Sequence, residues 1–110
     1  IQALDGKGAR IDAEVEFLGK GKAQIHARGP VFRDPQLASL PITLEMAVLK
    51  GEAMEWTIEK ACELGVRHFV PVLCAHAVVQ VDRKGPEYYR ERWQKIADQS
   101  LKQSGRLERM

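Results

Sequence analysis

The residues best suited to chemistry lie near the end of the sequence, in the run Gln-Ser-Gly-Arg at Gln103 to Arg106. The guanidinium of Arg106 is permanently charged and presents several N–H groups to an anion. Gln103 and Ser104 add hydrogen-bonding side chains, and Gly105 permits a close approach of the backbone. The run has a purely structural interpretation as well, in which Gly105 is the left-handed residue that ends a helix.

A second group of charged residues, Lys50 and Glu52, flanks Gly51 directly after an apolar run. Ligands of parallel sheets bind near the carboxyl ends of the strands, so this position favours a role in substrate binding. The alternative is a solvated turn in which Glu52 complements the positive end of a helix dipole.

The elements that position these residues follow from the hydrophobic pattern. The near-continuous apolar run Ile42 to Leu49 predicts a strand covered on both faces. A helix from Glu52 to Leu64 is predicted next, with Gly65 as its left-handed stop. Its apolar stripe has offsets of three and four and consists of Met54, Ile58, Ala61 and Cys62. A second buried strand at Val66 to Leu73 completes one parallel β-α-β crossover.

Two further elements are predicted before the Gln-Ser-Gly-Arg run. Ala77 to Val81 forms a third strand-like piece, and a long helix follows from about Pro86 to Ser104. Proline is tolerated in the first turn of a helix, so Pro86 can open this one.

Residues 1–29 have a different pattern, which favours antiparallel strands. Asp5 to Gly8 read Asp-Gly-Lys-Gly, which is typical of a hairpin turn. Apolar and polar residues alternate from Asp12 to Phe17 and from Ala23 to Arg28, as in half-buried strands. Residues 30–41 carry three prolines and no periodicity, so they are predicted to connect the two regions. The predicted fold class is α/β.

Composition excludes some classes of protein. The longest apolar runs fall far short of the ~20 residues of a membrane-spanning helix. Cys62 and Cys74 lack metal-site spacing, so we expect buried free thiols in a reducing cytoplasm rather than a disulfide or a metal site. A net charge of +2 permits a nucleic-acid partner without requiring one. Because the sequence opens inside a strand-like run and stops after a helix with no closing element, we expect a fragment.

Three stretches carry a resemblance to a known family: KGEAMEWTIEKACELGV at Lys50 to Val66, the strand HFVPV, and ERWQKIADQSLKQSGR at Glu91 to Arg106. Together they resemble RsmE, the bacterial 16S ribosomal RNA uridine-N3 methyltransferases of the SPOUT superfamily. The first block matches the family pattern in full and the second with one departure, at a position where the family carries alanine. The segment Ala3 to Val15 is similar to the end of the family's N-terminal PUA-like barrel.

The resemblance implies a domain plan and an activity. Residues 1–29 would end a PUA-like β-barrel, 30–41 would be a linker, and 42–110 would be the first half of a SPOUT domain without its knot. The parent would use S-adenosylmethionine to methylate 16S rRNA as a cytoplasmic homodimer, with its cofactor site outside this fragment. Arg106 would be the catalytic cation or a phosphate ligand. The residues expected to bind substrate are Gln103, Ser104, Gly105, Lys50 and Glu52.

One departure from the family concerns the residues after HFVPV. The family usually has Ser-Glu-Arg-Ser/Cys there, whereas this chain has Cys74, Ala75, His76 and Ala77. Three functions remain open at this stage. They are an inactive fragment of a methyltransferase, an RNA-binding module without catalysis, and a plain α/β interaction domain.

Overall fold

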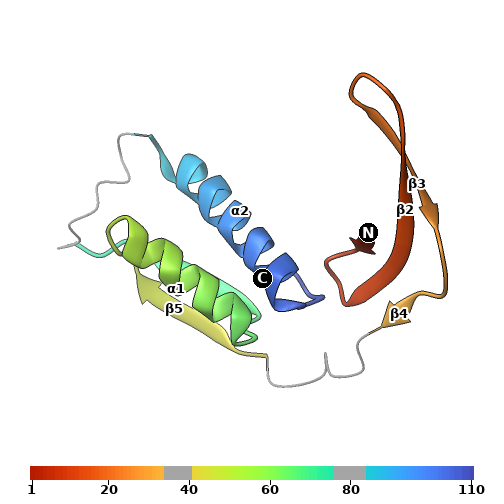
Figure 1. Ribbon diagram of the computed structural model, residues 1–110. Helices are drawn as coiled ribbons and strands as arrows, with labels where there is room; N and C mark the ends of the chain where they lie inside the picture. The colour runs from red at the N-terminus through yellow and green to blue at the C-terminus, as the bar shows by residue number, and fades with distance from the viewer. Residues whose placement is uncertain (34–40, 76–83) are drawn as a thin grey trace.

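The computed structural model describes residues 1–33, 41–75 and 84–110, which form an antiparallel sheet and an α/β unit (Figure 1). Most of the predicted connector, His76 and the strand predicted at Ala77 to Val81 lie outside these residues. None of the helices in the described ranges is long and apolar enough to cross a membrane.

The antiparallel sheet is organised around one long strand, to which the three others pair. The strands are β1 (Gln2–Leu4), β2 (Ala9–Gly19), β3 (Lys22–Ala27) and β4 (Phe32–Arg33). The predicted antiparallel pairing of the first three is confirmed. β4 was not predicted, because two residues are too few to show a period. It lies inside the interval 30–41 that we expected to be a connector without strand structure.

The turn between β1 and β2 is fixed by one side chain. Asp5 Oδ1 accepts hydrogen bonds from the backbone N–H groups of Lys7 at 2.7 Å and Ala9 at 3.0 Å. The bonds from Ala9 and Lys7 lower the pKa of Asp5, because they stabilise the carboxylate. The Asp-Gly-Lys-Gly run therefore forms a turn between two antiparallel strands, as predicted.

The α/β unit contains the predicted crossover. β5 (Thr43–Ala47) leads into α1 (Glu52–Glu63), which returns to β6 (His68–Val72), and the two strands are parallel. Gly65 follows α1 with a positive φ of 91°, as its predicted role as a stop requires. The apolar stripe of α1 is buried as predicted, at Met54, Ile58, Ala61 and Cys62.

One face of the β5–β6 sheet is covered and the other is not. Leu44 pairs with Phe69 on the covered face, and Phe69 packs against the core that α1 and α2 form. On the opposite face Val70 and Val72 are 40% and 39% exposed. The prediction that both faces are covered is therefore wrong for this chain, because no described element packs on the second face.

The long helix α2 (Pro86–Ser104) has the predicted bounds and packs along α1. The core between sheet and helices is small and consists of Val48, Met54, Ile58 and Ala97, with Phe69, Trp93, Ile96 and Met110 packed against it. Both cysteines are free thiols, but only Cys62 is buried. Cys74, two residues after β6, is exposed, contrary to the expectation that both thiols are buried.

The last residues of the chain close the structure, contrary to the expectation that no closing element follows α2. Leu107 is buried, and its carbonyl accepts a hydrogen bond of 3.1 Å from Gly8 N–H. The backbone N–H of Arg109 donates to the carbonyl of Gly6 at 2.8 Å. The segment 106–110, which we call the C-terminal strap, thus joins α2 to the turn between β1 and β2 (Figure 1).

Candidate functional site

The direction of the helices decides which predicted residues meet. Contacts near the start of α1 involve the first half of α2, and contacts near its end involve the second half. Arg92 Nη2 lies 2.6 Å from Glu55 Oε1, and Ser100 Oγ donates to the carbonyl of Glu59 at 3.0 Å. The helices are therefore parallel, and the carboxyl ends of both lie at the same end of the α/β unit.

The Gln-Ser-Gly-Arg run lies at this end. α2 ends at Ser104, and Gly105 has the left-handed conformation with a φ of 75°. Ser104 Oγ donates a hydrogen bond of 3.4 Å to the carbonyl of Leu101, one turn earlier. The structural interpretation of Gly105 is thus correct. Gln103, Ser104 and Gly105 are all exposed, so their polar groups are accessible to a ligand.

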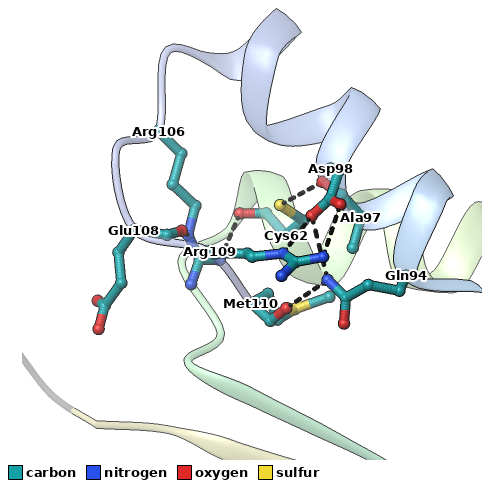
Figure 2. A network of polar contacts seen from close by, with 8 residues as sticks. All are labelled: Cys62, Gln94, Ala97, Asp98, Arg106, Glu108, Arg109 and Met110. Carbon is teal, nitrogen blue, oxygen red and sulfur yellow. Dashed lines mark hydrogen bonds and ion pairs between the residues drawn. The ribbon is translucent and has the colours of Figure 1, made fainter. Parts of the chain in front are cut away.

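Arg106 turns back toward the body of the protein. Its Nε donates to the carbonyl of Glu108 at 2.6 Å and its Nη1 to the carbonyl of Cys62 at 3.0 Å (Figure 2). The Cys62 carbonyl belongs to the last turn of α1 and also accepts a hydrogen bond of 3.2 Å from the backbone N–H of Gly65. The half-buried Arg106 guanidinium therefore ties the end of α1 to the C-terminal strap, and no other hydrogen bond joins its side chain to a described residue.

Arg109 and Asp98 form the second part of this network. Arg109 Nε and Nη2 donate to the two carboxylate oxygens of Asp98 at 2.8 and 2.9 Å (Figure 2). Gln94 donates to the same carboxylate at 3.1 Å and to the carbonyl of Met110 at 2.9 Å. Desolvation raises the pKa of Asp98, but the bonds from Arg109 and Gln94 outweigh it, so the pKa is lowered. This pair was not predicted from the sequence; it joins α2 to the strap eleven residues later.

Lys50 and Glu52 lie at the other end of α1. Both side chains are exposed, and Gly51 makes the turn between β5 and the helix with a φ of 53°. At 1.5 Å of rise per residue, α1 separates its two ends by about 16 Å. The two groups of predicted substrate-binding residues therefore do not form one compact site. A single ligand that reaches both must be as long as the helix.

A pocket of about 570 Å³ lies between β6 and the first half of α2. Among the described residues its lining is mainly apolar, with Phe69, Pro71 and Trp93, and it includes Arg90, which lies 4.0 Å from Glu87. The expectation that the cofactor site lies outside this chain stays a prediction.

Comparison with known proteins identifies the family. A family model described as an RNA methyltransferase domain matches residues 36–110. The chain is 44% identical over 71 residues to "Ribosomal RNA small subunit methyltransferase E" of Bacillus subtilis, covering 63% of this chain and 28% of that protein. It is 32% identical over 106 residues to the Synechocystis protein of the same name, covering 96% of this chain and 33% of that protein.

The fold agrees with a solved structure. The chain superposes with a TM-score of 0.84 and 31% identity on ribosomal RNA small subunit methyltransferase E from Neisseria gonorrhoeae, which was crystallised with bound S-adenosyl methionine. The match covers 98% of this chain and 44% of that protein. The chain thus spans less than half the length of each of these relatives, and its fold is that of one part of them. By sequence and by fold, this chain belongs to the RsmE family of RNA methyltransferases.

Proposed function

We propose that the protein containing this chain transfers a methyl group from S-adenosylmethionine to N3 of a uridine in 16S ribosomal RNA, and that the 110 residues alone are inactive. The observation that carries the proposal is the match of an RNA methyltransferase family model to residues 36–110, together with the superposition on a relative that holds S-adenosyl methionine. The protein acts in the cytoplasm as a homodimer. Residues 1–29 belong to a PUA-like barrel and 42–110 to a knotted SPOUT domain that continues beyond this chain.

The proposed reaction sets requirements for the protein. Uracil N3 carries an imide proton, and this proton must leave before the nitrogen can attack a methyl group in line. The developing negative charge on the base needs a fixed cation close by. Lowering the pKa of the uracil N3–H by two units requires that the deprotonated uracil be stabilised by about 2.7 kcal/mol relative to the neutral form. One desolvated guanidinium can supply this stabilisation. S-adenosylmethionine, when bound, supplies the methyl group as an electrophilic sulfonium.

We assign the cation to Arg106. Two of its donors hold backbone carbonyls, and this orients the guanidinium so that its remaining N–H groups can meet the base or an RNA phosphate. Gln103, Ser104 and Gly105 lie exposed beside it and would bind the RNA. Lys50 and Glu52, at the other end of α1, would contact a more distant part of the same RNA.

The first experiment compares this chain with the full-length protein by calorimetric titration with S-adenosylmethionine. We expect binding by the full-length protein alone. Methylation of small-subunit rRNA, with the modified atom identified by mass spectrometry, then tests the reaction. RNA binding with steep salt dependence but no response to the cofactor would support the RNA-binding module instead. Binding of the cofactor by the 110 residues would refute our placement of its site.

The role of Arg106 requires a test that separates catalysis from folding. We expect Arg106→Lys in the full-length protein to lower the methylation rate at saturating RNA and cofactor. A variant that is less stable yet methylates at the original rate once folded would show that Arg106 is only structural. Lys95→Ala is a control for a lost positive charge, because Lys95 is exposed on α2 and forms no ion pair with a described residue.

A further inference from the structure

Arg106 is oriented in part by a carbonyl that belongs to no helix. Its Nε donates to the carbonyl of Glu108 at 2.6 Å, whereas its Nη1 donates to the carbonyl of Cys62, in the last turn of α1. The helix fixes the position of the Cys62 carbonyl. The position of the Glu108 carbonyl depends instead on the contacts that hold the C-terminal strap.

Asp98 holds the strap to α2. Its two carboxylate oxygens accept hydrogen bonds of 2.8 and 2.9 Å from Arg109 Nε and Nη2 (Figure 2). Two bonds between a planar guanidinium and a carboxylate fix direction as well as distance. Gln94 adds bonds to the same carboxylate and to the carbonyl of Met110. Asp98 lies beside the buried Ala97, so α2 presents its carboxylate from a backbone that is packed in the core.

The other polar contacts of the strap are less able to fix the Glu108 carbonyl relative to α1. The turn between β1 and β2 holds the strap through backbone hydrogen bonds, but this turn belongs to the antiparallel sheet. The side chain of Glu108 pairs with Arg67 at 3.5 Å, which is longer than either bond between Asp98 and Arg109. In the described part of the chain, the pair of Asp98 and Arg109 is therefore the strongest polar link from α2 to the strap.

We propose that Asp98 is a positioning residue for the methyl transfer, which acts on Arg106 through Arg109 and the strap. By holding Arg109, it keeps the neighbouring Glu108 carbonyl where that carbonyl orients the Arg106 guanidinium. The inference rests on the proposed function, which assigns the cation to Arg106. A fixed cation stabilises developing charge without reorganising during the reaction, and it stays fixed only if surrounding hydrogen bonds lock its own position.

The test measures methylation of small-subunit rRNA by the full-length protein. We expect Asp98→Asn to lower kcat by about 10- to 100-fold, because displacing a catalytic group by about 1 Å can cost a hundredfold in rate. The value of kcat/KM for RNA should fall by the same factor, since the lost interaction serves the transition state. Arg109→Gln removes the other partner of the pair and should cause the same loss. Calorimetric titration with S-adenosylmethionine gives the folded fraction of each variant, and the rates are corrected by it.

A double variant separates positioning from a general loss of folding. The ammonium group that Arg106→Lys introduces cannot be held by both carbonyls, so the strap has little left to orient. Adding Asp98→Asn to Arg106→Lys should therefore lower the rate by less than about twofold further. If Asp98 only stabilises the fold, Asp98→Asn should cost the same factor in both backgrounds, because independent effects multiply. That result would overturn the inference.

Glu87→Gln is the matched control. Glu87 lies in the first turn of α2, its side chain is 79% exposed, and its pair with Arg90 is 4.0 Å long. The change from carboxylate to amide is the same as in Asp98→Asn, but it touches no residue of the strap. We expect a rate within about twofold of the unchanged protein, since surface changes away from a contact have small effects. Equal losses from Glu87→Gln and Asp98→Asn would contradict a specific role for Asp98.

The remaining outcomes separate this inference from the proposed function. If the unchanged protein methylates rRNA and Arg106→Lys is slow but Asp98→Asn is not, only the positioning role fails. If Arg106→Lys methylates at the original rate, the assignment of the cation fails and the positioning role with it. If the unchanged protein does not methylate rRNA, the proposed function fails, and so does the inference.

Discussion

Replacing Arg106 by alanine should destabilise the folded chain substantially, whatever the role of this residue in catalysis. The change removes the hydrogen bonds to the carbonyls of Cys62 and Glu108. A hydrogen bond to a charged group contributes about 1.5–3 kcal/mol, and the half-buried position favours the lower value. The two bonds together therefore predict a loss of about 3 kcal/mol. At ~4 °C per kcal/mol for a domain of this size, the melting temperature should fall by about 12 °C.

Urea unfolding followed by far-UV circular dichroism measures this loss. Arg106→Lys should retain only part of this stability. The lysine ammonium group cannot reach both carbonyls, as the planar guanidinium does. Arg90→Ala is the matched control, since its side chain is 80% exposed and its ion pair with Glu87 is 4.0 Å long. An Arg106→Ala chain with the urea midpoint of the Arg90→Ala chain would refute the reasoning.

Three further predictions concern the core, the thiols and pH. Ile58→Ala should lower the free energy of unfolding by about 2–5 kcal/mol, because Ile58 is 2% exposed between sheet and helices. The same urea unfolding measures this change, and a loss below about 1 kcal/mol would contradict the described core. In the native chain Ellman's reagent should label Cys74 rapidly and Cys62 only after unfolding, and rapid labelling of both would show that α1 does not pack as described. Because the folded-state pKa of Asp98 is lowered, the stability that it contributes is present above about pH 4 and is lost as pH falls further. Asp98→Asn should remove this part of the acid dependence, and an unchanged pH profile would contradict the bond to Arg109.

Most of the elements that were predicted from the sequence were predicted from the local spacing of apolar residues. The alternation from Asp12 to Phe17 requires one polar and one apolar face, and β2 has both. The stripe from Met54 to Cys62 can be buried only by a helix, and α1 buries it. In these segments the pattern repeats often enough to exclude the other element type.

The failures have a different physical origin. The five residues of the C-terminal strap are too few to show a period, and their partners lie in a turn at the opposite end of the sequence. The apolar run of β5 resembles a strand covered on both faces, but coverage depends on elements that the sequence of the strand does not specify. For Arg106, residue type predicted a cation, whereas only the fold shows which carbonyls it holds.

The C-terminal strap also has a consequence for how the chain folds during synthesis. Lys7, in the turn after β1, forms a β-bridge with Glu108 near the end of the sequence. During synthesis this turn therefore leaves the ribosome long before Glu108 is made. The α/β unit and the antiparallel sheet can each form local contacts earlier, but their docking must wait for the strap. Closing so long a loop costs conformational entropy, which the contacts of the strap with both parts must offset.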